Sequence, residues 1–194
     1  MAITLLYLAG AGTVLLPNRD LTLVPREDGG NLIVNPPREV WDRSELSFSE
    51  LSHWSALIAS TARAMIDALP QLDGGCINYW EAGNWALNDH AAPEGPKTAR
   101  EYRKTHMHLL GRSRAACNPS WRWGEAPKFP DFLQRHGWAA GFTRLTPPEC
   151  ANVIRRAVRL LNEKYRFFES IPSHHCSGCS YPSYFEVCEE CAAK

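Results

Sequence analysis

Residues 104–112 form an apolar, β-prone run with two histidines two positions apart, and this run constrains the fold more than any other stretch. Side chains of a β-strand alternate between its two faces. One face would carry Lys104, His106 and His108, and the other would carry Thr105, Met107 and Leu109. Two imidazoles and an ammonium suit an anion and nucleophilic or acid–base chemistry near neutral pH, whereas the second face suits a hydrophobic core. The run therefore predicts a strand with a chemical face and a core face.

Two helices are predicted from their capping residues. Before the first, Ser47 and Glu50 have the spacing of a capping box, and apolar residues then recur at helical spacing until Pro70. The second begins after Thr146, which has the capping-box spacing to a glutamate, and its apolar positions continue to about Phe168. We expect the second helix to pack on the domain or to mediate dimerisation, so a homodimer is one predicted assembly.

Strands are predicted on either side of the first helix. Before this helix the sequence predicts a strand at residues 21–25, a glycine-containing turn at 26–30 and a second strand at 31–36. After it, residues 76–84 predict a strand that enters a turn. Residues 85–103, rich in proline and mixed charge, predict a loop with one short helical turn. This loop either supplies cations to a substrate or is a solvated insertion, and we favour the insertion. Together, the helices and strands predict an α+β fold with a central antiparallel sheet.

The 104–112 run resembles the motif of the histidine triad (HIT) superfamily of nucleotide hydrolases and transferases, His-φ-His-φ-His-φ-φ, in which φ is apolar. When the two are aligned on residues 109–112, the family's nucleophilic middle histidine falls on His106 and its third histidine on His108. Lys104 stands in the place of the first histidine. A shifted register, with His108 as the nucleophile and Leu110 in the third place, is the alternative.

Two further segments resemble a bacterial branch of the same family. Residues 119–124 match a Pro/Trp segment that ends in Trp-Gly, and its tryptophans either stack on a nucleobase or, as we favour, close the core. Residues 76–84 match a strand on which an asparagine and a later Gly-Asn line the phosphate pocket. The resemblance implies an HIT-like antiparallel sheet with two principal helices in residues 1–170. Nucleotide- or phosphate-binding residues are implied at the matching positions Asn78, Asn84, Lys104 and Arg112.

The activity that the resemblance implies is hydrolysis of a nucleotide at its α-phosphate. His106 would attack the phosphorus to form a covalent nucleotidyl-histidine that water resolves, while His108 and Asn84 would hold the non-bridging oxygens. Two alternatives stay open. One is a nucleotidyltransferase that passes the same intermediate to a phosphate or sugar-phosphate acceptor, and the other is a catalytically weak nucleotide- or partner-binding module.

Residues 171–194 contain two Cys-x2-Cys pairs. Four thiolates in this pattern suit tetrahedral Zn²⁺ in a closed structural site. Because few apolar residues surround them, metal binding would supply the folding energy of this tail. Replacement of one cysteine ligand by His174 or His175 is an alternative, as are free or oxidised cysteines. The predicted ligands, which would form a zinc knuckle after the 1–170 domain, are Cys176, Cys179, Cys188 and Cys191.

Charge and the first residues exclude some classes of partner. The chain has 21 basic and 21 acidic residues, so its formal net charge is zero. Proteins that bind duplex nucleic acid or anionic membranes usually have a basic excess, so neither partner is expected. The first ten residues lack a basic n-region, and their apolar stretch is too short to span a bilayer. These features predict a cytoplasmic protein whose partner is a nucleotide or a nucleotide conjugate.

Overall fold

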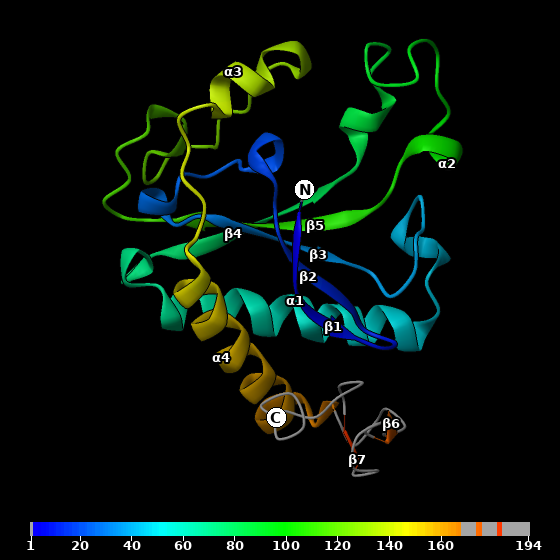
Figure 1. Cartoon of the computed structure of the whole chain (residues 1–194), viewed down its shortest axis with the longest axis vertical. Coiled ribbons are helices and arrows are strands. Elements are labelled where there is room, and N and C mark those ends of the chain that lie inside the picture. Colours follow the sequence, from blue (N-terminus) through cyan, green and yellow to red (C-terminus); the bar gives the residue numbers. More distant parts are fainter. Residues whose placement is uncertain (1, 168–173, 176–181, 184–194) are drawn as a thin grey trace.

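The computed structural model describes residues 2–167 and two short strands, β6 (His174–His175) and β7 (Pro182–Ser183), which pair with each other. Within residues 2–167 the chain forms an antiparallel sheet of five strands in the order β1-β2-β3-β5-β4 (Figure 1). The strands are β1 (Ile3–Leu8), β2 (Gly12–Leu16), β3 (Asn31–Asn35), β4 (Cys76–Ala82) and β5 (His106–Arg112). The predicted α+β class with an antiparallel sheet is confirmed.

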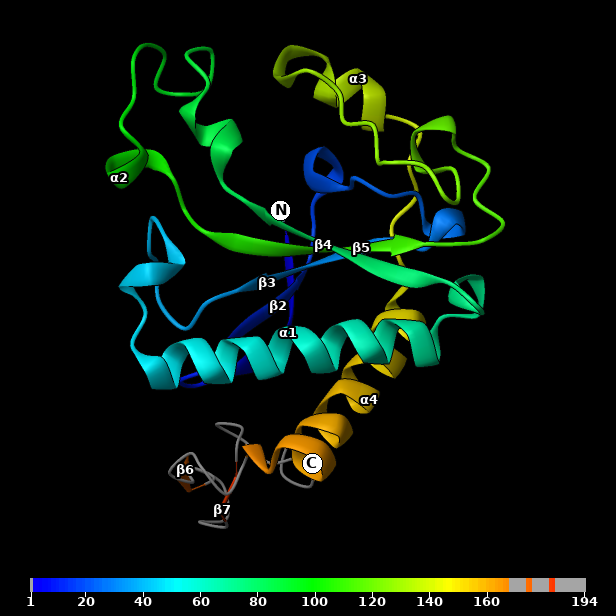
Figure 2. The same ribbon diagram turned by 180° about the vertical axis from the view of Figure 1, so that it is seen from behind.

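Both predicted helices are present and begin at their predicted caps. α1 (Phe48–Ala68) starts after Ser47, and α4 (Pro147–Tyr165) starts after Thr146, each with a complete capping box. Two shorter helices, α2 (Ala99–Tyr102) and α3 (Arg135–Ala139), lie in the connections. α1 and α4 pack against each other below the sheet (Figure 2), which confirms that the second principal helix packs on the domain.

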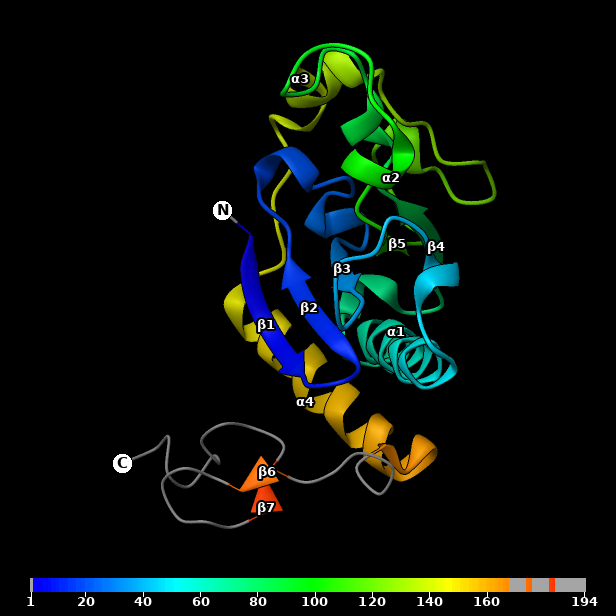
Figure 3. The same cartoon turned by 90° about the vertical axis from the view of Figure 1, so that its right-hand side faces the viewer.

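The two faces of the sheet are covered differently. The helical face forms the main core, to which β5 contributes Met107 and Leu109, as its period-2 alternation predicted. Irregular segments with α2 and α3 cover the opposite face (Figure 3). There Leu110 and Trp121 belong to a smaller buried cluster, so the tryptophan at 121 closes the core. His106 and His108 alternate with the core residues and therefore lie on this second face.

The predicted strand at 21–25 is wrong. Residues 23–25 have no regular structure, and β3 pairs instead with β2 and β5. The side-chain oxygen of Asn31 accepts hydrogen bonds from the backbone N–H groups of Leu23 (3.0 Å) and Val24 (3.3 Å), and its amide donates to the Leu21 carbonyl (3.2 Å). One buried carboxamide thus satisfies backbone groups that a neighbouring strand would otherwise satisfy. The hairpin that precedes β3 lies earlier in the chain, between β1 and β2.

The C-terminal cysteines predicted to bind zinc, at positions 176, 179, 188 and 191, lie outside the described residues. The predicted boundary at residue 170 lies there too. In the part of the chain that is described, no helix has both the length and the hydrophobicity needed to cross a bilayer.

Candidate functional site

His106 and His108 of β5 line a cavity of about 180 Å³ on the sheet face opposite α1. Sites that enclose a drug-sized ligand usually measure about 300–1,000 Å³, so this cavity suits one part of a larger molecule. β4 and β5 supply its floor, and the turn after β4 supplies its wall. The lining residues are Leu21, Trp80, Ala82, Gly83, Asn84, Trp85, Ala86, Lys104, His106 and His108.

His106 and His108 form a hydrogen-bonded pair whose protons can be placed. The Nδ1 atom of His106 lies 2.7 Å from the carbonyl oxygen of Lys104, and because a carbonyl only accepts, Nδ1 carries a proton. The Nε2 atoms of the two rings are 3.1 Å apart. In a neutral His106 the proton on Nδ1 leaves Nε2 with a lone pair, so His108 must donate its Nε2–H to it. The pair therefore presents a nucleophilic or basic nitrogen at His106.

Burial keeps both rings neutral. Burial lowers the pKa of His108 well below its usual 6.5, and the adjacent His106 lowers it further. Burial also lowers the pKa of His106, despite the hydrogen bond to Lys104. His108 is only 2% exposed, and its Nδ1 has no hydrogen-bond partner among the described residues. His106 is the more accessible of the two, and at neutral pH its Nε2 carries a lone pair, which here accepts the N–H of His108.

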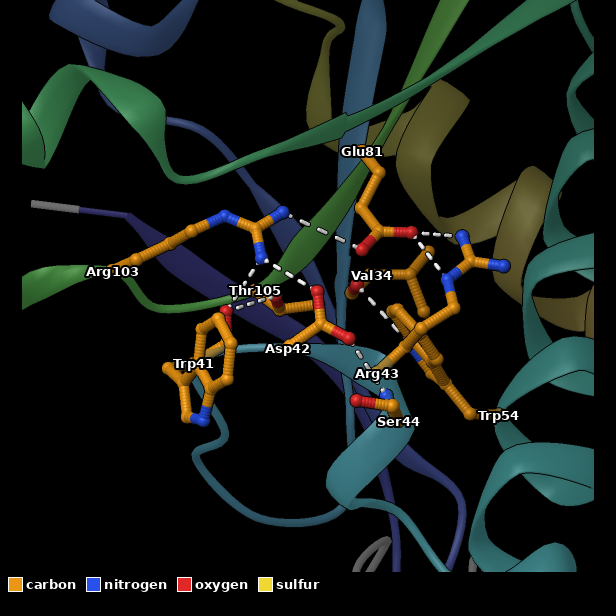
Figure 4. Close-up of polar contacts among 9 residues, drawn as sticks. All are labelled: Val34, Trp41, Asp42, Arg43, Ser44, Trp54, Glu81, Arg103 and Thr105. Atoms are coloured by element: carbon orange, nitrogen blue, oxygen red, sulfur yellow. Dashed lines mark hydrogen bonds and ion pairs between the residues drawn. The ribbon is translucent and has the colours of Figure 1, made fainter. Parts of the chain in front are cut away.

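The segment that holds the Lys104 carbonyl is anchored on both sides. The side chains of Arg103 and Thr105 both donate to the backbone carbonyl of Trp41, at 2.6 and 2.9 Å (Figure 4). Arg103 also pairs with Asp42 at 3.1 Å and with Glu81 of β4 at 3.6 Å. These contacts join the start of β5 to β4 and to the loop before α1. They restrict the peptide whose carbonyl orients His106.

A second part of the same network ties the loop before α1 to the sheet (Figure 4). Arg43 forms an ion pair with Glu81, and its guanidinium lies 5.9 Å from the ring of Trp54. The indole of Trp54 donates to the Val34 carbonyl of β3 at 3.3 Å. Sequence reasoning missed this network because two of its acceptors are backbone carbonyls, which leave no signal in residue type, and because its ion pairs to Glu81 join residues far apart in the chain.

Lys104 and Asn84 both line the cavity, as the sequence predicted for phosphate-binding residues. The ammonium of Lys104 pairs with Glu39 at 2.6 Å, and both side chains are largely exposed. Such an exposed pair contributes only about 0–1 kcal/mol, so an anionic substrate can displace the glutamate. The carboxamide of Asn84 is exposed, and Asn84 directly follows Gly83. A Cβ added at Gly83 would lie 2.8 Å from the Lys104 carbonyl oxygen, so the backbone before Asn84 lies close to the backbone before β5.

Asn78 and Arg112, also predicted to bind phosphate, do not reach this cavity. They lie on the same sheet face as the histidines but line a separate hollow beside residues 123–125. Arg112 is buried, and its guanidinium donates to the backbone carbonyls of Arg122 and Glu125. The resemblance implied that these residues share one pocket with the histidines, but lying on the same sheet face does not decide which cavity a side chain enters.

The wall of the cavity is aromatic, which sequence reasoning did not anticipate. Trp80 of β4 stacks on His108 with ring centroids 5.3 Å apart, and Trp85 meets Trp80 edge to face at 6.2 Å. Phe129 also packs against Trp80, with ring centroids 4.5 Å apart. The available signal was the register: Trp80 lies two residues after Asn78 on one strand face. In the 85–103 segment, Lys97 donates to carbonyls of the same segment, as expected of an insertion, whereas Arg103 makes the long-range contacts to Trp41, Asp42 and Glu81 described above.

Neither protein-family models nor curated proteins match this sequence. Within residues 2–167, no three histidine, cysteine or acidic side chains gather as metal ligands would. The chemistry of the cavity is therefore the guide to function.

Proposed function

We propose that this protein is a nucleotide hydrolase of the HIT type that acts at the α-phosphate through His106. The observation that supports this most is the hydrogen bond from His106 Nδ1 to the Lys104 carbonyl, because it leaves an Nε2 lone pair in the cavity. The hydrogen bond requires only the backbone of residue 104. The lysine that replaces the first histidine of the HIT motif is therefore compatible with an oriented nucleophile.

The reaction has two displacements at phosphorus. In the first, His106 Nε2 forms a bond to the α-phosphorus, the bond to the leaving group breaks, and the leaving group departs with the electron pair and takes a proton from solvent. In the second, water attacks the same phosphorus and loses a proton to solvent, the Nε2–P bond breaks, and a nucleoside monophosphate and neutral His106 are released. No cofactor is needed to balance either step.

The other cavity residues have supporting roles in this proposal. The Nε2–H of His108, which now faces His106, would move its hydrogen bond to a non-bridging phosphoryl oxygen when substrate enters, and this would free the lone pair of His106. Asn84 and Lys104 would donate to the same phosphoryl group. The aromatic wall at Trp80 and Trp85 would pack against an apolar part of the substrate.

The shifted register, with His108 as nucleophile, is less well supported. His108 is almost fully buried, and the hydrogen bond between the rings requires its Nε2 to carry the proton. To attack phosphorus, it would have to move that proton to Nδ1, which is buried without an acceptor among the described residues. Such a buried unpaired donor costs about 1–3 kcal/mol.

Product analysis with matched variants tests the proposal. Wild type, His106→Ala and the control His90→Ala, which changes an exposed loop histidine, are incubated with dinucleoside polyphosphates, nucleoside phosphoramidates and adenylylated or guanylylated compounds. We expect a nucleoside monophosphate from wild type and His90→Ala, and only background from His106→Ala. Products that form only with added phosphate or sugar phosphate would identify a transferase. Tight nucleotide binding without turnover under any condition would identify a binding module and contradict the hydrolase.

A further inference from the structure

A second hollow opens on the histidine face of the sheet, beyond the catalytic cavity. It has a volume of about 340 Å³ and combines side chains from the start of β4 and the end of β5 with the loop after β5. Its lining residues are Cys76, Asn78, Arg112, Trp123, Gly124 and Glu125. Nothing in the proposed reaction uses this hollow.

Arg112 places a buried, unneutralised positive charge in its wall. The side chain is 5% exposed, and one guanidinium nitrogen donates to the carbonyls of Arg122 (2.7 Å) and Glu125 (2.8 Å). The guanidinium also lies 5.7 Å from the ring of Trp121. Among the described residues the guanidinium of Arg112 has only these carbonyl and ring contacts and no ion pair with a carboxylate, and its Nε has no hydrogen-bond partner. A buried charge that is solvated only by carbonyls and a ring gains stability from an anion.

The loop that forms one wall of the hollow carries further cations. Residues 112–128 contain four cationic side chains and one carboxylate. That carboxylate, Glu125, lies 3.9 Å from Arg122 and 3.6 Å from Lys128, so its charge is already compensated. Arg114 lies over the exposed indole of Trp123, at 5.7 Å. The excess of cations in this loop favours the approach of an anion.

The hollow also contains neutral recognition groups. The carboxamide of Asn78 makes no hydrogen bond to any described residue, and it can donate to an oxyanion without adding charge. The indole of Trp123, 41% exposed, offers a flat apolar surface beside it.

We infer that this hollow is a binding site for the phosphate or carboxylate group of a small molecule, separate from the histidine cavity. Arg112 and Asn78 would contact the oxyanion, and Trp123 would pack against the group attached to it. Arg112 lies four residues from His108 along β5, about 13 Å at strand spacing. The ring of Phe129 contacts both Trp80 (4.5 Å), which lines the histidine cavity, and Trp121 (5.7 Å), which lies beside Arg112. The inference does not depend on the hydrolase proposal.

Proton–nitrogen NMR of the full chain tests this site with inorganic phosphate and with acetate, against sodium chloride at equal ionic strength. The signals to follow are the Arg112 Nε–H, the Asn78 side-chain amide and the Trp123 indole N–H. We expect saturable shifts at these groups with one or both oxyanions, and which of the two saturates identifies the preferred group. His106→Ala should bind as wild type does.

Two variants distinguish a specific binding site from non-specific association of the anion with the protein surface. Asn78→Ala should weaken binding about tenfold, since a hydrogen bond to a charged group contributes about 1.5 kcal/mol or more. Arg112→Lys should abolish saturation, and its spectrum reports whether the loop still folds. Shifts that stay linear and equal to those in chloride would overturn the inference, as would saturable shifts confined to the histidine cavity. Loss of turnover in His106→Ala with oxyanion binding intact would show that the two sites are independent.

Discussion

The Lys104 carbonyl determines which ring nitrogen of His106 holds the proton, and this single contact gives the candidate site its chemistry. Part of the site was predictable at this scale. Period-2 alternation placed both histidines on one face because strand geometry depends little on context. The tautomers were not predictable, since they depend on a backbone acceptor and on the burial of His108.

His108 can be tested by a substitution that keeps its packing. His108→Phe retains a ring against Trp80 but removes the N–H that would hold a phosphoryl oxygen. We expect turnover to fall about 100- to 1,000-fold, as is typical when one transition-state donor is lost. Product formation at saturating substrate measures this, with His90→Ala as the matched control; unchanged turnover would remove His108 from the mechanism.

The same variant tests the pH dependence of stability. Burial lowers the pKa of His108 below its usual 6.5, so below that pH the unfolded chain binds a proton that the folded chain does not. This contribution to stability is present above pH 6.5 and is lost as the pH falls below it, by up to about 1.4 kcal/mol per pH unit. Urea unfolding gives the free energy of unfolding at each pH between 7.5 and 5. This free energy should fall less steeply with decreasing pH in His108→Phe than in wild type, and equal pH dependence in the two proteins would contradict the burial of His108.

At the scale of elements, local capping signals correctly predicted both principal helices, whereas the prediction of a strand at residues 21–25 was wrong. Capping boxes depend on residues three positions apart, so the sequence contains the whole interaction. The fate of residues 21–25 depends instead on Asn31, whose carboxamide takes the place of a strand partner. Its side chain could equally have faced solvent, and sequence does not distinguish the two cases.

Glu149 connects the start of α4 to the rest of the domain. Although burial raises its pKa, hydrogen bonds from Arg26 and Thr146 lower the pKa to about 2. The stability that this gives is present above the usual pKa of about 4.5 and is lost as the pH falls toward 2. Glu149→Gln should lower the free energy of unfolding by about 1–3 kcal/mol at pH 7. The difference in this free energy between wild type and the variant should become smaller below pH 4.5. Urea unfolding measures this against Glu163→Gln, an exposed change in α4; an equal loss in both would contradict the account.

The end of β5 requires glycine at position 111. An added Cβ would lie 2.8 Å from the Cα of Gly29 and would also meet its carbonyl group, and backbone cannot move aside as a side chain can. Gly111→Ala should therefore destabilise the fold by about 1–3 kcal/mol. Thermal or urea unfolding checks this, with Gly137→Ala in α3 as the control, since nothing lies within 4 Å of a Cβ there. Equal stability of the two variants would refute the close approach.

At the scale of the whole molecule, one face of the sheet carries the main hydrophobic core and the other carries the candidate functional sites. α1 and α4 bury one face, while loops cover the other and enclose two hollows of different character. The sequence predicted which face is chemical, but not that its polar residues divide between two cavities. Phe129, which lies in the loop after β5, packs on this face against both Trp80 and Trp121.

The C-terminal cysteines add a prediction at this scale. Four thiolates in two Cys-x2-Cys pairs should bind one zinc ion per chain in a structural role. Metal analysis of purified protein should show one equivalent, reduced in Cys176→Ser and unchanged in Cys76→Ser. Turnover should survive removal of zinc if the hydrolase site is independent of the tail, and wild-type protein free of zinc after growth with ample metal would contradict the site.

The most direct test of the proposed chemistry is to trap the covalent intermediate. A nucleotide conjugate that yields product is mixed with the protein, and the mixture is quenched in base because phosphoramidates are labile in acid. The protein is then digested and sequenced by mass spectrometry. We predict a nucleotidyl group on His106 in wild type and none in His106→Ala. A nucleotidyl group on His108, or turnover that continues without any modified histidine, would contradict the account.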